Sequence, residues 1–315
     1  MNPYFTLQPV GSGIWAVFSV PGSGSVGNAA IIDLGGTVVI VDTFGLPEAA
    51  SYLKETAEQL TGQAVDYVIN THYHGDHHYG NQVFSGISRI ISTEKTRDFL
   101  TRNVPADLAS WQSGLRGQIA SLQSVADAAT DFRLKEALHF EISEKTILLA
   151  ATPEIRRVTA DLTFTDEMVL YGKERLIRLI TFGGGHTLSD AMVYIPDAGM
   201  LIAGDLVLGR FHPAMLHGDA EAWRKILDRI EAELLIQSII PGHGFVTDGR
   251  SLEEMRRYLR DIEDHVRQAV TSGETVDFWL GRGIPSLYDE WQGSHVYEWN
   301  FRWLYDRMKE GSNSL

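Results

Sequence analysis

The stretch NTHYHGDHHYG at positions 70–80 constrains this chain more than any other feature. It holds four side chains that can bind a metal, namely His72, His74, Asp76 and His77. Histidines at i and i+2 project to nearly opposite sides of a helix, and a bent segment, which Gly75 permits, lets both meet at one ion. A carboxylate is favoured at the start of a following helix, which suits Asp76. The spacing therefore predicts a metal-binding loop between a strand and a helix.

Three further polar residues follow apolar runs, each beside glycine: His186 in GGGHTLSD, Asp205 in LIAGD and His243 in SIIPGHG. Asp and Gly are common after strands, so each residue alone is also explained as turn chemistry. Loops at strand ends carry active-site groups in layered folds, and three such positions favour one shared site.

Apolar runs and turn signals alternate in both halves of the chain. Strands are expected at 28–34, 37–43, 66–70, 88–93, 175–182, 191–196, 200–205 and 237–241. Helices are expected at 47–60, 220–234, 251–270 and 296–308. This repeat predicts an α+β, four-layer αββα sandwich, in which two sheets pack face to face with helices outside. An open βαβ sheet is the competing architecture, but no glycine-rich nucleotide fingerprint follows a first strand.

The chain is expected to form one αββα domain at 1–273, followed by an aromatic-rich extension at 274–315 packed on it. Residues from about 103 to 150 are helical in period and interrupt the strand pattern, so they are expected to be a helical insertion. The tryptophans of the extension are expected to pack in a core or an interface, which leaves a homodimer open.

The composition limits the classes of partner that this chain is expected to bind. Formal charge is −14, with 41 acidic and 27 basic residues, so a phosphate backbone is repelled and nucleic acid is not expected as a partner. No window approaches the length of a membrane span and no signal peptide is expected, so we expect a cytoplasmic protein that acts on a small molecule. The chain has no cysteine, so any metal is bound by nitrogen and oxygen donors.

These motifs together resemble the metallo-β-lactamase superfamily. The His-x-His-x-Asp-His signature matches at 72–77, and the later ligands match in GHT, GD and PGHG surroundings, over about residues 13–250. The resemblance implies one metal held by His72, His74 and His186. It implies a second held by Asp76, His77 and His243, with Asp205 bridging both.

The resemblance also bears on the subtype. Antibiotic-hydrolysing members generally lack an aspartate at the bridging position, and several use a cysteine near it. Asp205 in a chain without cysteine is more similar to hydroxyacylglutathione hydrolases, acyl-homoserine lactonases and related esterases or phosphodiesterases. Flavodiiron oxygen reductases usually carry a carboxylate at the position of His74, which disfavours a redox di-iron site.

The resemblance thus implies a metal-dependent hydrolase with two divalent ions, for which zinc is expected, although manganese, iron and cobalt accept the same donors. By this resemblance, a bridging hydroxide oriented by Asp76, which would also shuttle its proton, would cleave a carboxylic ester, lactone or thioester. Phosphodiester or phosphotriester cleavage on the same centre is one alternative. A mononuclear iron dioxygenase of the persulfide-oxidising type is another, and a non-enzymatic metal-binding protein is a third.

Four more residues are candidates near this centre. Asp42 is either the acceptor for a ligand histidine's second N–H or a cap of the helix at Pro47. Thr187 either supports His186 or starts a turn. Phe211 is a candidate for the pocket wall, and His212 either reaches the substrate or lies on a surface loop.

Overall fold

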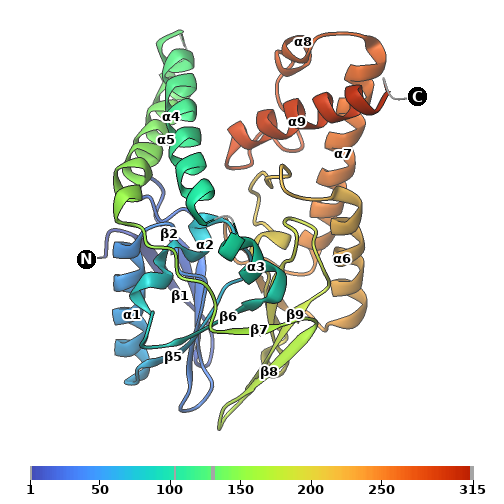
Figure 1. Ribbon diagram of the computed structural model, residues 1–315. Helices are drawn as coiled ribbons and strands as arrows, with labels where there is room; N and C mark the ends of the chain where they lie inside the picture. Colours follow the sequence, from blue (N-terminus) through green and yellow to red (C-terminus); the bar gives the residue numbers. More distant parts are fainter. Residues whose placement is uncertain (1, 103, 129–131, 313–315) are drawn as a thin grey trace. The chain divides into compact units, whose positions relative to one another are not determined.

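The computed structural model describes residues 2–102, 104–128 and 132–312 (Figure 1). The chain forms two compact units, Met1–Ile177 and Arg178–Leu315. Positions 103 and 129–131 of the expected insertion, and 313–315 of the expected extension, lie outside the described residues.

The first unit contains a mixed sheet with the strand order β1-β2-β3-β4-β5-β6-β7. Its strands are β1 (Phe5–Gly11), β2 (Ile14–Ser19), β3 (Ala29–Asp33), β4 (Val38–Val41), β5 (Val65–Ile69), β6 (Arg89–Thr93) and β7 (Leu162–Phe164). Pairing is antiparallel from β1 to β4 and parallel from β4 to β7. The expected hairpin between β3 and β4 turns at Gly35 and Gly36, whose φ values of 82° and 89° favour glycine.

Helix α1 (Pro47–Thr61) begins at the expected proline and buries Ala49, Ala50, Leu53 and Ala57. It ends at Gly62, which has a left-handed φ of 69°. After β5 come the short helix α2 (Gly75–His78) and the 3-10 helix η1 (Tyr79–Val83). Helix α3 (Glu94–Arg102) follows β6.

The expected insertion is helical. Helices α4 (Val104–Ala128) and α5 (Phe132–Ala151) form an antiparallel hairpin between α3 and β7 (Figure 1). Leu115 and Leu148 are buried in the core of the first unit, and the Trp111 ring lies 4.6 Å from that of Tyr79. The hairpin therefore packs on the chain that follows α2.

The second sheet has the order β12-β11-β10-β9-β8, and the unit boundary falls within β9. Its strands are β8 (Glu167–Tyr171), β9 (Leu176–Thr181), β10 (Ala191–Ile195), β11 (Met200–Ile202) and β12 (Ser238–Ile240). Strands β9, β10 and β11 pair antiparallel, whereas β11 and β12 pair parallel. Both sheets are mixed, so the α+β class is confirmed and the open parallel sheet is wrong.

The helices of the second unit are α6 (Ala220–Glu233), α7 (Arg250–Ser272), α8 (Val276–Leu280) and α9 (Ser294–Ser312). Asp219 caps α6 by accepting a hydrogen bond from the Ala222 backbone N–H at 2.8 Å. Trp279, Trp291 and Trp303 pack against the buried apolar cluster of this unit. Among the helices described, none is both long and apolar enough to span a membrane.

Gly80 shows how closely η1 and α1 approach in the first unit. A Cβ atom at Gly80 would lie 2.1 Å from the Thr43 carbonyl oxygen and 2.4 Å from Ala50 Cβ. We predict that Gly80→Ala lowers the free energy of unfolding by about 1–3 kcal/mol, because it overpacks this contact. Urea denaturation followed by circular dichroism measures the change.

The matched control is Gly114→Ala in α4, where a Cβ meets nothing within 4 Å. Because alanine is the better helix former, this variant is expected to be more stable by about 0.5–1 kcal/mol. Equal midpoints for the two variants would contradict the close packing at Gly80.

Candidate metal centre

The loop between β5 and α2 gathers four of the expected ligands, and we call His72, His74, Asp76 and His77 the first cluster. Ligand atoms of His72 and His74 lie within 4.8 Å of each other. The His72 and His77 rings are 4.3 Å apart, and His77 Nε2 lies 3.4 Å from Asp76 Oδ2. Asp76 occupies the first turn of α2, as expected. The chain bends at Gly75, where a Cβ would lie 2.0 Å from the Tyr79 ring.

Asp42, directly after β4, forms hydrogen bonds to residues of this loop. His77 Nδ1 donates to Asp42 Oδ2 at 2.8 Å, and the Thr71 backbone N–H donates to Oδ1 at 2.8 Å. A carboxylate only accepts, so His77 carries its hydrogen on Nδ1 and presents an Nε2 lone pair, the form that binds a metal. Asp42 does not cap α1, whose N-cap residue is Leu46.

Thr71 links Asp42 to a second histidine, His72, through hydrogen bonds. The Thr71 hydroxyl donates to Asp42 Oδ2 at 2.8 Å, and its oxygen lies 3.0 Å from His72 Nδ1. Because the only hydroxyl hydrogen goes to Asp42, His72 Nδ1 must be the donor in the second bond. His72 therefore also presents an Nε2 lone pair. Burial raises the pKa of Asp42, while His77 and Thr71 oppose that rise.

Two buried asparagines fix the backbone of α2. Asn70 Nδ2 donates to the His77 carbonyl at 3.3 Å and to Asn81 Oδ1 at 3.0 Å, and Asn81 Nδ2 donates back to Asn70 Oδ1 at 2.8 Å. The Thr43 backbone N–H also donates to the His77 carbonyl, at 3.0 Å. Thr71, Asn70 and Asn81 were not predicted as site residues from the sequence. Only their closeness to the histidine motif was a signal.

The second unit gathers the other three expected ligands, which we call the second cluster: His186, Asp205 and His243. Each follows a strand, in the loop after β9, in the 3-10 helix after β11 and in the loop after β12. Asp205 Oδ2 lies 3.3 Å from His186 Nε2 and 3.4 Å from His243 Nε2. A Cβ at Gly242 would lie 1.9 Å from Asp205 Oδ1, so glycine is required there.

Asp190 shapes the loop that carries His186. Its Oδ2 atom accepts hydrogen bonds from the backbone N–H groups of Gly185 at 2.8 Å and His186 at 2.9 Å. Oδ1 accepts from the Thr187 N–H at 3.0 Å and from the Thr187 hydroxyl at 2.6 Å. Both the backbone N–H and the hydroxyl of Thr187 thus donate to Asp190, in the loop that carries His186. The His186 ring also packs against Trp223, at 5.2 Å.

Phe211 and His212 occupy different surroundings. The Phe211 ring stacks on His243, with centroids 4.8 Å apart and planes inclined by 27°. His212 is 1% exposed, and its Nδ1 lies 3.0 Å from the Tyr258 hydroxyl, so its placement on a surface loop is wrong. Burial lowers the pKa of His212 to about 4, which keeps the ring neutral.

The donor set fits divalent metal ions. The two clusters supply five imidazoles and two carboxylates, with no thiolate, because the chain lacks cysteine. Imidazole and carboxylate suit zinc and also manganese, iron and cobalt. Two of the imidazoles have their ring hydrogens fixed away from Nε2 by Asp42 and Thr71.

We predict that Asp42→Asn weakens metal binding by about 10–100-fold, because an amide has a single acceptor oxygen and cannot accept from both His77 and the Thr71 backbone N–H. Zinc affinity is measured by competition with a chromophoric chelator. Asp161→Asn is the control, since Asp161 Oδ2 also accepts from a backbone N–H, that of Ile90 at 2.9 Å. An equal affinity in wild type and Asp42→Asn contradicts the assigned role.

Comparison with known proteins agrees with the fold and the donors. A family model described as the Metallo-beta-lactamase superfamily matches residues 22–243. The solved metallo-beta-lactamase from Pontibacter korlensis is 17% identical, with a TM-score of 0.60 over 81% of this chain and 99% of that one. TMB-1 is 16% identical, with a TM-score of 0.60 over 82% and 98% of the two chains. DIM-1 metallo-beta-lactamase is 18% identical, with a TM-score of 0.59 over 82% and 98%.

The match to the family model covers more than half of the chain, and the solved structures share its fold. The expected superfamily and fold are therefore confirmed, whereas the kinship with hydroxyacylglutathione hydrolases and lactonases stays a prediction. With this match and its His/Asp donors, the chain belongs to the metallo-beta-lactamase superfamily and is a metal-dependent hydrolase.

Proposed function

We propose that the two clusters together hold two divalent metal ions, with zinc as the first candidate, and that the enzyme hydrolyses a carboxylic ester, lactone or thioester. His72, His74 and His186 would hold one ion, and Asp76, His77 and His243 the other. When bound, such a pair supplies hydroxide at neutral pH and stabilises negative charge on oxygen.

The position of Asp205 is the observation that carries this proposal. One oxygen of this carboxylate lies beside His186 of the first proposed set and beside His243 of the second. A single carboxylate oxygen between two histidines of different sets suits a ligand shared by two ions. A shared aspartate in a chain without cysteine favours the esterase and lactonase members over true β-lactamases.

The residues of the chain contribute orientation and proton transfer. Asp42 and Thr71 keep the Nε2 lone pairs of His72 and His77 directed outward for binding. The side chain of Asp76 is 22% exposed, whereas that of His77 is fully buried. Solvent therefore reaches the Asp76 carboxylate. We assign to it the orientation of the attacking hydroxide and the transfer of its proton.

Removal of metal by a chelator is expected to abolish hydrolysis, and added zinc or manganese is expected to restore it. The assay panel contains lactones, thioesters, aryl esters, aryl phosphodiesters and a β-lactam, measured with the metal content of each sample. Activity that persists in metal-free enzyme contradicts the mechanism. Activity on phosphates alone would contradict the proposed substrate class and favour a phosphodiesterase or phosphotriesterase. One iron per chain together with oxygen uptake would contradict hydrolysis and favour a dioxygenase.

Asp205→Asn is expected to lower the metal content from two ions to one or fewer, because the shared negative charge is lost. Elemental analysis measures the content, and hydrolysis of the best substrate in the panel is expected to fall with it. Asp248→Asn is the control, since Asp248 forms an exposed ion pair with Arg250 in the same unit. Two ions retained in Asp205→Asn would contradict a bridging role.

A further inference from the structure

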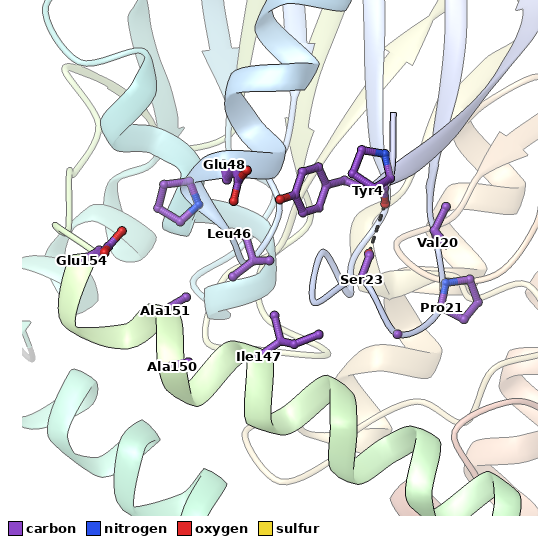
Figure 2. A pocket seen from close by; sticks show the side chains of 13 residues that line it. Tyr4, Val20, Pro21, Ser23, Leu46, Glu48, Ile147, Ala150, Ala151 and Glu154 are labelled. Atoms are coloured by element: carbon purple, nitrogen blue, oxygen red, sulfur yellow. Dashed lines mark hydrogen bonds between the residues drawn. The ribbon is translucent and has the colours of Figure 1, made fainter. Parts of the chain in front are cut away.

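The first unit contains a hollow of about 590 Å³ that none of the seven proposed ligands lines (Figure 2). Four segments form it: the chain before β1, the turn after β2, the start of α1, and the last turns of α5 with the 3-10 helix η2 (Thr152–Glu154) that follows. Small-molecule sites commonly have volumes of about 300–1,000 Å³. The hollow therefore has room for a ligand of modest size.

Most of the lining is apolar. Figure 2 shows Ile147 on α5 directed toward Leu46, with Ala150 and Ala151 along the same helix. Leu46 is 5% exposed, but Ile147 is 37% exposed, so the floor of the hollow offers an apolar side chain to solvent. Burial of this surface under an apolar group is favourable at roughly 25 cal/mol per Å².

The polar part of the lining is acidic. Glu48 and Glu154 are both exposed, and Figure 2 shows them on the side of the hollow away from Val20 and Pro21. Glu48 lies in the first turn of α1, where the helix dipole stabilises its negative charge. Among the described residues that line the hollow, none is a lysine, arginine or histidine.

Tyr4 joins the acidic side to the apolar side. Burial, together with the neighbouring carboxylate of Glu48, raises the pKa of Tyr4 to about 12, so the ring stays neutral. The ring also lies 5.4 Å from that of Tyr52. A neutral aromatic face beside carboxylates attracts a cation.

We propose that this hollow binds an organic ammonium ion that carries an apolar body. The ammonium group lies at Glu48 beside Tyr4, Glu154 adds negative charge on the same side, and the apolar body lies on Ile147 and Leu46. An anion of the same shape is repelled by the two carboxylates and by the net charge of −14. This site is separate from the proposed metal centre, so its test does not depend on hydrolysis.

Titration calorimetry of the full chain with octyltrimethylammonium, below its micelle concentration, tests the proposal. We expect one site per chain, and we expect octanesulfonate to bind at least about tenfold more weakly. The double variant Glu48→Gln, Glu154→Gln is expected to weaken octyltrimethylammonium binding by about tenfold or more. Equal binding of the cation and the anion overturns the proposal, as does the absence of any binding.

Two further variants show where the ligand binds. Glu55→Gln, Glu94→Gln changes the net charge equally at exposed positions outside the hollow, and it is expected to retain wild-type affinity. Ala150→Trp places an indole in the hollow and is expected to abolish binding. Unchanged binding in Ala150→Trp, or an equal loss in the Glu55/Glu94 control, places the cation elsewhere and overturns the proposal.

Discussion

The buried carboxylate of Asp42 determines which nitrogen carries the hydrogen in two histidines of the first cluster. It accepts from His77 directly, and it accepts the Thr71 hydroxyl hydrogen, which leaves the Thr71 oxygen to accept from His72. This arrangement depends on the sheet, because β4 and β5 are parallel neighbours and Asp42 and Thr71 both lie just beyond their ends. Asp42 has a left-handed φ of 61°, a conformation that is uncommon for a residue with a side chain.

The second cluster is supported in a different way. Asp190 accepts mainly from backbone N–H groups, so it fixes the path of the loop on which His186 stands rather than the ring itself. The close approach of Gly242 to Asp205 adds a backbone constraint at the end of β12. One cluster thus depends on a buried side-chain network and the other on loop geometry. Substitution of a supporting residue should change which ring nitrogen carries the hydrogen in the first cluster. In the second cluster it should change the position of the ligand side chain.

The sequence predicted those features that short spacings determine. The ligands at 72–77, the hairpin at Gly35-Gly36 and the helix from Pro47 follow from local patterns, and the predicted strand at 175–182 corresponds to β9 at Leu176–Thr181. Partners far apart along the chain could not be predicted with the same certainty. Asp42 lies 35 positions before His77, so its role depends on strand register, and the sequence left it open between two roles.

Burial and concavity were also beyond sequence reasoning. The segment around His212 reads as a loop, yet aromatic residues from distant positions, among them Tyr258, Trp291 and Tyr297, surround that ring. The hollow beside Tyr4 is formed by four segments spread from Pro3 to Glu154, and none of them carries a recognisable motif. Such features arise from tertiary packing, which residue periodicity does not encode.

The α4–α5 hairpin has a consequence for how such an enzyme can diversify. It lies between β6 and β7, which are parallel neighbours in one sheet, and α3 already lies on the connection between them. A parallel crossover of this kind needs only a dozen or more residues. The connection therefore tolerates a shorter, longer or exchanged hairpin without a change in strand order. Because Ile147 and Ala150 belong to α5, each such exchange would alter what the surface beside Tyr4 recognises.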